Sequence, residues 1–296
     1  MCENSGPTKL AVTIDAPGAV LHGYLFAPQS GQPRLAIVIH PATGVPQSYY
    51  ARFARWLAED RQAAVLIYDY RDMGESSRGP MKDSRATMSD WGVLDQSVAL
   101  DFLCERYPAL PVWVIGHSLG GMCLPWHDKA DRVERLITVA SGKAYFTRHP
   151  LSYIPAVLLF WFVLGPVTTR LFGYLPGKFA GIGADLPANA FWQWRRWCLS
   201  RDFYKGDWGN AMPVPDLGRM KGDVTLTAIS DDVMMTAESV KRLAESYPAA
   251  RVRFREITPD SVGLKNIGHL RIFSERCKAA WPAILEENGE ALRQAA

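Results

Sequence analysis

The chain has 296 residues, of which 48% are hydrophobic and 21% are charged, and its 33 basic and 30 acidic residues leave a net charge of +3. This composition is typical of a globular protein long enough for a sizeable core, built as one domain with an insertion or as two domains. The small net charge does not by itself predict binding to nucleic acid or to an anionic membrane.

The cysteines and the first ten residues bear on the cellular setting. The five cysteines are far apart and form neither a Cys-x-x-Cys pair nor a metal spacing with histidine: Cys2, Cys104, Cys123, Cys198 and Cys277. The opening residues, MCENSGPTKL, place an acidic residue and small polar residues where a secretory signal needs an apolar segment. We therefore expect reduced thiols, no metal site and a cytoplasmic location.

The first half of the chain alternates strand-like and helix-like segments. The run Leu35-Ala-Ile-Val-Ile39 is apolar throughout, which is typical of a strand buried on both faces. In chain order, the pattern predicts strands at 10–14, 20–26 and 35–39, a helix at 49–59, a strand at 64–70, a helix at 90–106, a strand at 111–115, a helix after Gly116 and a strand at 136–140. Such alternation over short connections favours right-handed crossovers and a parallel sheet covered on both faces.

The pattern changes between Gly142 and Gly218, where Trp, Phe, Pro and Gly are frequent and no strand period is visible. Beyond this segment the alternation resumes, with a predicted strand at 224–229, a helix at 237–246, a strand at 252–257 and a last helix from Arg271. We therefore predict one α/β domain over residues 1–296, into which residues 142–218 are inserted as a cap.

Within the insertion, the run YIPAVLLFWFVLGPV from Tyr153 to Val167 carries no charge. It is shorter than the roughly 18 residues that a membrane span usually needs, and it contains two prolines and a glycine. We favour a cap helix over an apolar pocket. An interfacial or membrane-spanning segment is the alternative.

The strongest local signal is Gly116-His-Ser118-Leu-Gly120, which follows an apolar strand and precedes an expected helix. This order is typical of a nucleophile elbow, a sharp turn in which flanking glycines relieve crowding and the serine hydroxyl is lifted clear of the sheet. The backbone N–H of Leu119 would then face a developing oxyanion.

A serine hydroxyl is a poor nucleophile at neutral pH, so it needs a histidine base that is held by a third group. His269 lies in the segment Asn266-Ile-Gly-His-Leu270, between the last strand and the last helix, where it could reach Ser118. The other histidines lack a matching context.

Two aspartates, Asp231 and Asp232, leave the end of a predicted strand and precede a helix that Thr236 could cap. Catalytic groups gather at the carboxyl ends of strands in open α/β sheets, so either carboxylate is well placed to hold the histidine. Adjacent residues at a strand end point in different directions, so we expect only one of them to reach the imidazole. The alternative is that both are turn or capping residues.

Five segments carry a resemblance to known proteins: HPATGVPQSYY, YDYRDMGESS, DWG, GHSLGG and IGHLRIF. In these segments the chain is similar to a group of predicted bacterial α/β hydrolases with a serine-aminopeptidase-like core. It resembles the α/β-hydrolase superfamily over nearly its full length outside the insertion. The resemblance implies an α/β-hydrolase fold, a mostly parallel sheet flanked by helices, with a triad in the order Ser118, Asp232 and His269. Asp232 is preferred because it lies four residues before Thr236, as in the family's acid frame.

The resemblance also concerns the loops around the site. The family's His-Gly-x-x-Gly loop is His40-Pro-Ala-Thr-Gly44 here, which implies that the N–H of Ala42 joins that of Leu119 in an oxyanion hole, since Pro41 has no N–H. We expect His40 to hold this loop. The family's Arg-Gly-x-Gly is Arg71-Asp72-Met-Gly74 here, a departure that leaves the conformation of that loop open.

Aromatic residues of the insertion are the candidates for substrate binding. On a helix, Phe191, Trp194 and Trp197 share one face, whereas Arg195 and Arg196 lie towards another. This pattern favours cap packing with a basic edge over binding of an acidic substrate. We expect four residues to line an apolar substrate pocket: Phe160, Phe162, Trp194 and Trp197.

These observations predict a cofactor-independent serine hydrolase that cleaves a carboxylic ester or thioester with an apolar acyl part. We expect no metal and no nucleic acid, and a lipid surface is a candidate for transient contact through the cap. An acyltransferase with the same triad is one alternative, and a catalytically silent binding protein on this fold is another.

Overall fold

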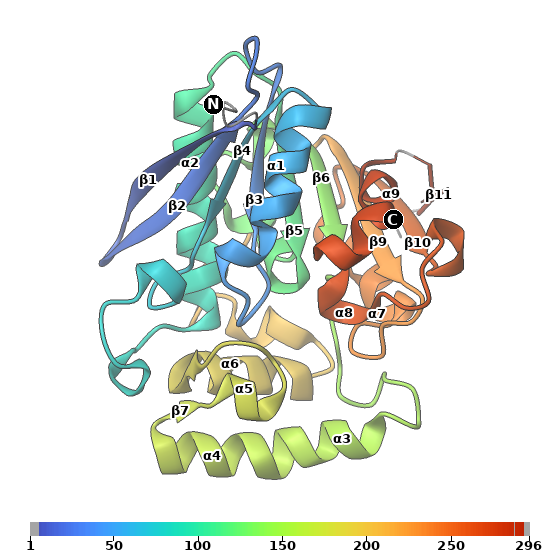
Figure 1. Cartoon of the computed structure of the whole chain (residues 1–296). Helices are drawn as coiled ribbons and strands as arrows, with labels where there is room; N and C mark the ends of the chain where they lie inside the picture. The colour runs from blue at the N-terminus through green and yellow to red at the C-terminus, as the bar shows by residue number, and fades with distance from the viewer. Residues whose placement is uncertain (1–5, 287, 293–296) are drawn as a thin grey trace.

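The computed structural model describes residues 6–286 and 288–292, so Cys2 and the first half of MCENSGPTKL lie outside the described residues. Within this part of the chain, a nine-stranded sheet has the order β1-β2-β4-β3-β5-β6-β9-β10-β11 (Figure 1). The strands from β4 to β10 run parallel, whereas β1, β2 and β11 pair antiparallel at the two edges. The predicted mostly parallel sheet is confirmed.

Each predicted strand is present, with ends that differ by a few residues. The strands are β1 (Thr8–Ala16), β2 (Ala19–Ala27), β3 (Leu35–His40), β4 (Ala63–Tyr68), β5 (Val112–His117), β6 (Val133–Val139), β9 (Asp223–Ile229), β10 (Arg251–Ile257) and β11 (Glu290–Ala291). Every residue of β3 and β4 is buried, as expected for strands covered on both faces. Among the described strands of this nine-stranded sheet, only the short edge strand β11 was not predicted.

Helices cover both faces of the sheet. They are α1 (Ala51–Asp60), α2 (Gln96–Arg106), α7 (Ala237–Lys241), α8 (Gly268–Arg271) and α9 (Trp281–Leu285). Helix α2 continues from a π-helical segment at Asp90–Asp95, so the predicted helical stretch is correct. Thr236 caps α7, because its Oγ1 accepts a hydrogen bond from the Ser239 N–H at 3.3 Å.

Three predicted helices differ in form from the structure. The helix predicted at 237–246 is α7 followed by a 3₁₀ segment at Arg242–Ser246. After Ser118 the chain forms short 3₁₀ turns at Ser118–Gly121 and Leu124–Trp126. Paired glycines disfavour a helix, and Pro125 lacks the N–H that a longer helix would need. The last helix is likewise divided into α8, a 3₁₀ segment at Glu275–Ala280 and α9, with non-helical backbone at Cys277 and a proline in the first turn of α9.

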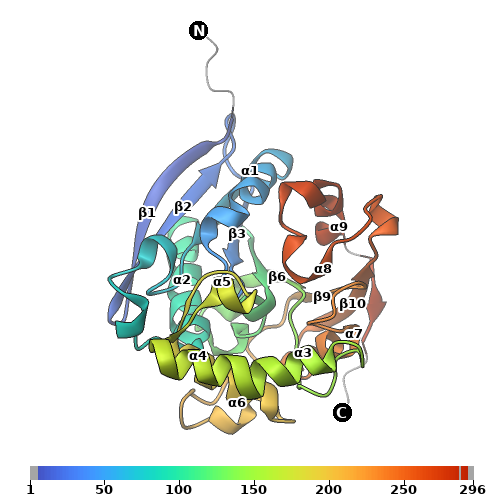
Figure 2. The same ribbon diagram turned by 60° about the horizontal axis from the view of Figure 1, so that its bottom comes forward.

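The segment between β6 and β9 lies across the carboxyl ends of the parallel strands (Figure 2). It contains α3 (Ile154–Leu159), a π-helical segment (Phe160–Leu164), α4 (Gly165–Phe172), β7 (Tyr174–Leu175), α5 (Gly177–Ala180), β8 (Leu186–Pro187), α6 (Ala188–Leu199) and a 3₁₀ segment (Phe203–Asp207). We call this segment the cap. The β7–β8 pair was not predicted, because strands of two residues leave no readable period.

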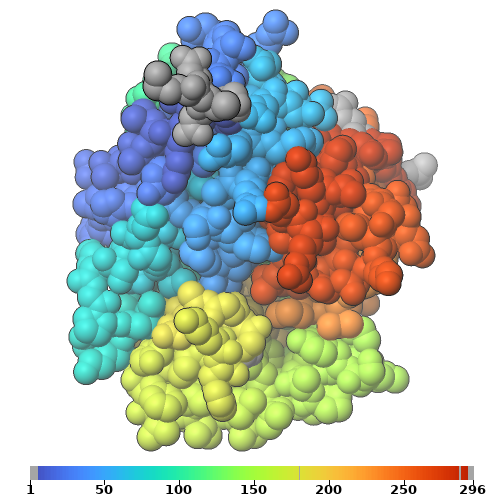
Figure 3. All heavy atoms as spheres, viewed as in Figure 1, coloured from blue at the N-terminus to red at the C-terminus, as the bar shows by residue number. Residues whose placement is uncertain are grey.

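The first three cap elements form one helical stretch from Ile154 to Phe172. It has 19 residues and a mean hydropathy of 1.6, so by length and composition alone it could cross a membrane. Only 28% of its most apolar window is buried inside the protein. In Figure 3 the cap forms one end of the molecule, and the α3–α4 stretch lies at its outer edge.

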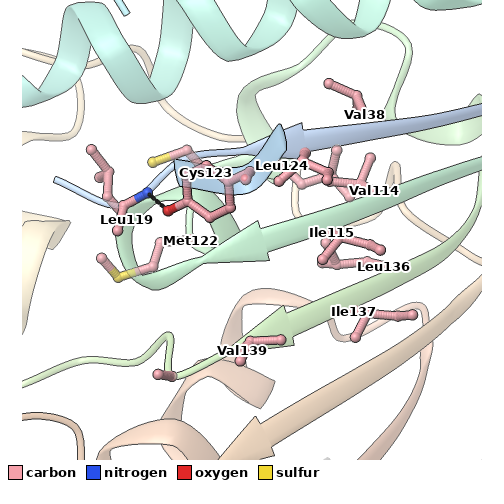
Figure 4. Close-up of a cluster of buried hydrophobic side chains, with 14 of the residues drawn as sticks. Val38, Val114, Ile115, Leu119, Met122, Cys123, Leu124, Leu136, Ile137 and Val139 are labelled. Carbon is pink, nitrogen blue, oxygen red and sulfur yellow. Dashed lines mark hydrogen bonds between the residues drawn. The ribbon is translucent and has the colours of Figure 1, made fainter. Parts of the chain in front are cut away.

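The hydrophobic core supports the turn that carries Ser118. Val114 and Ile115 of β5 pack with Leu136 and Ile137 of β6 (Figure 4). Leu119 and Met122, which come just after β5 and Ser118 in the chain, belong to the same buried cluster. The Met122 N–H donates to the Leu119 carbonyl at 3.1 Å, which closes the turn. The turn is therefore anchored by its own apolar side chains.

Candidate active site

Ser118 occupies a strained turn directly after β5. Its φ angle is 52°, in the left-handed region that non-glycine residues seldom adopt. A Cβ at Gly116 would lie 2.3 Å from the Gly121 Cα, and a Cβ at Gly120 would lie 2.0 Å from the His40 carbonyl oxygen. The turn therefore requires both flanking glycines, as the sequence motif predicts.

The structure brings Ser118, His269 and Asp232 into one hydrogen-bonded chain. The His269 Nε2 lies 3.1 Å from the Ser118 Oγ, and its Nδ1 lies 2.7 Å from the Asp232 Oδ2. The other carboxylate oxygen of Asp232 accepts hydrogen bonds from the Met234 and Met235 N–H groups at 2.8 and 2.9 Å. A carboxylate only accepts, so Nδ1–H donates to the fully buried Asp232 side chain and the Nε2 lone pair faces the serine hydroxyl.

Asp231 has a different task. Its two carboxylate oxygens accept hydrogen bonds from the N–H groups of Ile267 and Gly268, each at 2.8 Å. Gly268 has a φ of 66°, a conformation that glycine adopts without steric cost. Asp231 therefore anchors the turn that carries His269, and only Asp232 contacts the imidazole.

Of the two predicted oxyanion donors, the N–H groups of Ala42 and Leu119, only that of Leu119 is free to face the site in the described part of the chain. The Ala42 N–H donates to the Tyr50 hydroxyl at 2.9 Å, so it is engaged in the core and does not serve the site as predicted. The reason is Tyr50, which approaches the loop from the turn before α1. Thr43 and Leu119 line the cavity at Ser118, and neither N–H makes a hydrogen bond within the described part of the chain.

His40 is buried at the end of β3, where the His40–Gly44 loop begins. Its Nδ1 lies 2.8 Å from the Tyr68 hydroxyl, and burial lowers the pKa of its imidazole well below the usual value. His127 packs edge-on against it and donates Nε2–H to the Gly92 carbonyl at 2.9 Å. Among the described residues, no group of three or more His, Cys, Asp or Glu could hold a metal ion.

The unusual Arg71-Asp72-Met-Gly74 loop is accommodated without glycine at its second position. Asp72 has a φ of 62°, and aspartate tolerates this left-handed conformation better than most residues. Arg71 anchors the loop through three hydrogen bonds to the buried Asp95: its backbone N–H donates at 2.8 Å, and its guanidinium donates twice, at 2.6 and 2.8 Å. Burial raises the pKa of Asp95 to about 6, although Arg71 acts in the opposite direction.

An apolar cavity of about 290 Å³ connects the cap to Ser118 and His269. Phe160 and Trp194 line it, as predicted. Other apolar lining residues come from the expected cap helix: Tyr153, Ala156, Val157, Leu159, Trp161 and Leu164. The remaining ones were not anticipated, because they come from separate segments: Met88, Leu119, Met122, Ala144, Ile182, Cys198, Phe203, Met234 and Met235. A cavity closed by so many distant segments leaves no local pattern in the sequence.

Phe162 and Trp197 do not line this cavity, which corrects their prediction. Phe162 is two residues from Phe160, so a helical turn directs it outwards and 49% of its surface is exposed. Trp197 is buried, and its indole N–H donates to Asp207 at 2.7 Å. Asp207 also pairs with Arg196, so the basic edge of α6 is partly neutralised within the cap.

Fold and site together define an α/β hydrolase with a serine, histidine and aspartate at the carboxyl edge of its sheet. A family model described as the alpha/beta hydrolase family matches residues 36–279. The chain belongs to this family.

Individual relatives are more distant. Monoglyceride lipase from Homo sapiens is 29% identical over 110 residues, a segment that spans 36% of this chain and 34% of that protein. A soluble variant of monoglyceride lipase from Saccharomyces cerevisiae, solved with a substrate analogue, has a TM-score of 0.62 at 16% identity and covers 96% of this chain and 95% of its own. A bacterial membrane phospholipase A has a TM-score of 0.55 at 15% identity and covers 95% and 86%. These structures share the fold.

Proposed function

We propose that this protein is a serine hydrolase that cleaves a carboxylic ester or thioester with an apolar acyl part. The observation that carries the proposal is the Ser118–His269–Asp232 hydrogen-bond chain at the end of an apolar cavity. Lipases and esterases among the similar proteins support ester chemistry in general terms.

The reaction follows from the hydrogen-bond directions. Ser118 Oγ attacks the substrate carbonyl carbon while its proton passes to His269 Nε2, and Asp232 stabilises the imidazolium. His269 then protonates the departing alcohol or thiol, which leaves an acyl group on Ser118. Water attacks this acyl-enzyme with His269 as base, releases the carboxylic acid and restores the serine.

We assign the oxyanion to the N–H groups of Leu119 and Thr43. Thr43 replaces Ala42 in this role because it lines the cavity beside Ser118, whereas the Ala42 N–H donates to Tyr50. Donors that are already oriented stabilise the developing charge without reorganisation.

Two alternatives keep the same fold. An acyltransferase would form a new ester when an alcohol or thiol acceptor is supplied, whereas a hydrolase releases acid alone. A catalytically silent binding protein would not react with a fluorophosphonate probe. Labelling of the folded protein by the probe, followed by product analysis with and without an acceptor, tests the proposal against both.

The cavity predicts a preference for longer acyl chains. Each buried methylene contributes about 0.8 kcal/mol, so kcat/KM on p-nitrophenyl esters should rise up to about fourfold per methylene until the cavity is full. Phe160→Ser should flatten this rise and leave acetate turnover nearly unchanged, because Phe160 lines the cavity.

Phe162→Ser is the matched control in a lipid-free assay. Its side chain points outwards, so its chain-length profile should match that of the parent. A flat profile in the parent, or equal losses on acetate and longer esters in Phe160→Ser, would show that the cavity does not select the acyl chain.

We also propose that the cap rests on an anionic lipid surface. The α3–α4 stretch exposes several apolar residues, and five of them form what we call the cap apolar face: Leu158, Phe162, Val163, Val167 and Leu171. Residues 142–218 contain eight Lys and Arg and four Asp and Glu, a net charge of +4, whereas the whole chain carries +3. Arg195 lies over the Phe162 ring, 5.3 Å from its centroid, and apolar side chains beside basic ones favour interfacial binding to anionic lipid.

The cap apolar face is continuous with the cavity. Leu159 and Leu164 both line the cavity and are 49% and 36% exposed, so they lie where the cavity meets the outer surface of the cap. An acyl chain leaving a lipid surface could therefore enter towards Ser118 without crossing water.

The lipid contact is tested by sedimentation with phosphatidylcholine vesicles that contain increasing phosphatidylglycerol. Binding should rise with the anionic lipid and fall at least tenfold in Phe162→Ser/Leu171→Ser, which removes two exposed apolar side chains. Leu10→Ser/Val20→Ser is the matched control, because both residues are exposed on β1 and β2, which are not part of the cap. Equal binding by both variants, or a dimer that masks this face in lipid-free solution, would overturn the proposal.

A further inference from the structure

A chain of hydrogen bonds in the core links three loops of the site. The Ala42 N–H donates to the Tyr50 hydroxyl at 2.9 Å, and this hydroxyl lies 2.7 Å from the His117 Nδ1. The His117 Nε2 in turn lies 2.9 Å from the backbone carbonyl oxygen of His269. The chain therefore runs from the loop after β3, past the residue that precedes Ser118, to the residue expected to act as base.

The direction of every bond in this chain is determined. A carbonyl oxygen only accepts, so His117 carries its proton on Nε2 and donates to His269. Burial, reinforced by the neighbouring His269 imidazole, lowers the pKa of His117 to about 3, so the ring is neutral and Nδ1 accepts. Tyr50 must then donate its proton to Nδ1, which leaves its oxygen to accept from Ala42.

The chain is enclosed by apolar packing. Tyr50 and His117 are 1% and 0% exposed, and Phe273 packs against both rings at centroid distances of 5.3 and 4.9 Å. A neutral, fully paired network in such an environment is rigid, because breaking any bond leaves a buried polar group unsatisfied.

We propose that Tyr50 and His117 are positioning residues. They hold the main chain of His269 and the loop at Ala42 in a fixed position relative to Ser118. The inference rests on the proposed serine hydrolase function. Asp231 fixes the same turn from the opposite side, through the N–H groups of Ile267 and Gly268, so His269 is held at both its N–H side and its carbonyl. Neither Tyr50 nor His117 lines the cavity, so both act through His269 and the loop.

Two substitutions at His117 separate the two ends of the chain. Glutamine keeps an N–H donor near the position of Nε2 and so retains the bond to His269, whereas asparagine keeps only a partner for Tyr50. A misplacement of catalytic groups by about 1 Å can cost about 10²-fold in rate. We expect His117→Asn to lose about 10²-fold in kcat with little change in KM, and His117→Gln to recover most of that loss.

Tyr50→Phe tests the other end. Without the hydroxyl, the His117 Nδ1 loses its donor and the ring can take the other tautomer, which breaks the bond to His269. We expect at least a tenfold loss in kcat and in the rate of Ser118 labelling by a fluorophosphonate, again with little change in KM. Tyr204→Phe is the matched control, because Tyr204 is equally buried and its hydroxyl pairs with Ser246, away from these loops.

The measurements are kcat, KM, labelling rate and Tm for all four variants and the parent. Losses in Tyr50→Phe and His117→Asn no larger than in Tyr204→Phe, or losses fully explained by a lower folded fraction, would overturn the inference. So would faster turnover in Tyr50→Phe, which would mean that the released Ala42 N–H serves the oxyanion. Retained turnover in Ser118→Ala would instead refute the proposed function itself.

Discussion

Replacing Ser118 with alanine should remove ester hydrolysis and leave the fold intact. The expected loss in kcat is on the order of 10³ to 10⁶, by analogy with the removal of triad members in other serine hydrolases. The change deletes only the hydroxyl that lies 3.1 Å from His269 Nε2, and the hydrogen bond from the Met122 N–H to the Leu119 carbonyl still closes the turn. Turnover of a p-nitrophenyl ester and the circular dichroism spectrum of both proteins measure the two effects.

A second measurement on the same variant identifies the nucleophile directly. In the parent, mass spectrometry after fluorophosphonate treatment should place the adduct on the peptide that contains Ser118, and Ser118→Ala should carry no adduct. Near-parental turnover in the alanine variant, or an adduct on another serine, would show that the mechanism is wrong.

Asp232→Asn should cripple turnover, whereas Asp231→Asn should cost far less. An amide at position 232 favours the wrong histidine tautomer, because its N–H₂ would face Nδ1, and a comparable change in another serine hydrolase costs about 10⁴ in kcat. At position 231 the amide oxygen can still accept one of the two bonds from Ile267 and Gly268, so the turn keeps part of its anchor.

The two aspartate variants are matched controls for one another, since they are adjacent and make the same chemical change. Steady-state kinetics on one ester and thermal unfolding of both proteins complete the comparison. A larger loss in Asp231→Asn than in Asp232→Asn would move the role of the triad acid to Asp231.

The sequence by itself determined the sheet and the central site residues. Continuous apolar runs such as Leu35–Ile39 are typical of strands covered on both faces, and their alternation with helical segments indicated a parallel sheet. The Gly116–Gly120 motif defined the turn, because its glycines are the residues that such close backbone contacts permit. His269 followed from its place between the last strand and the last helix.

The tertiary structure alone decided which of several plausible groups faces the site. Asp231 and Asp232 have the same chemistry, and their side chains differ only in direction. In the folded chain Asp231 binds the N–H groups of Ile267 and Gly268, whereas Asp232 binds the imidazole of His269. Phe160 and Phe162 are equally apolar, but helical geometry directs one into the cavity and the other to the surface.

Hydrogen bonds between residues far apart in the sequence were likewise not predictable from the sequence alone. The resemblance of the His40–Gly44 loop to the family's loop implied that the Ala42 N–H serves the oxyanion. Nothing in that loop indicates its bond to Tyr50, and nothing near Tyr50 indicates His117, 67 residues further along. Local patterns record which residues are buried and how backbone turns are built. The partner of a buried polar group is set by which segments the fold brings together, so the engagement of Ala42 and the support of His269 emerge only in three dimensions.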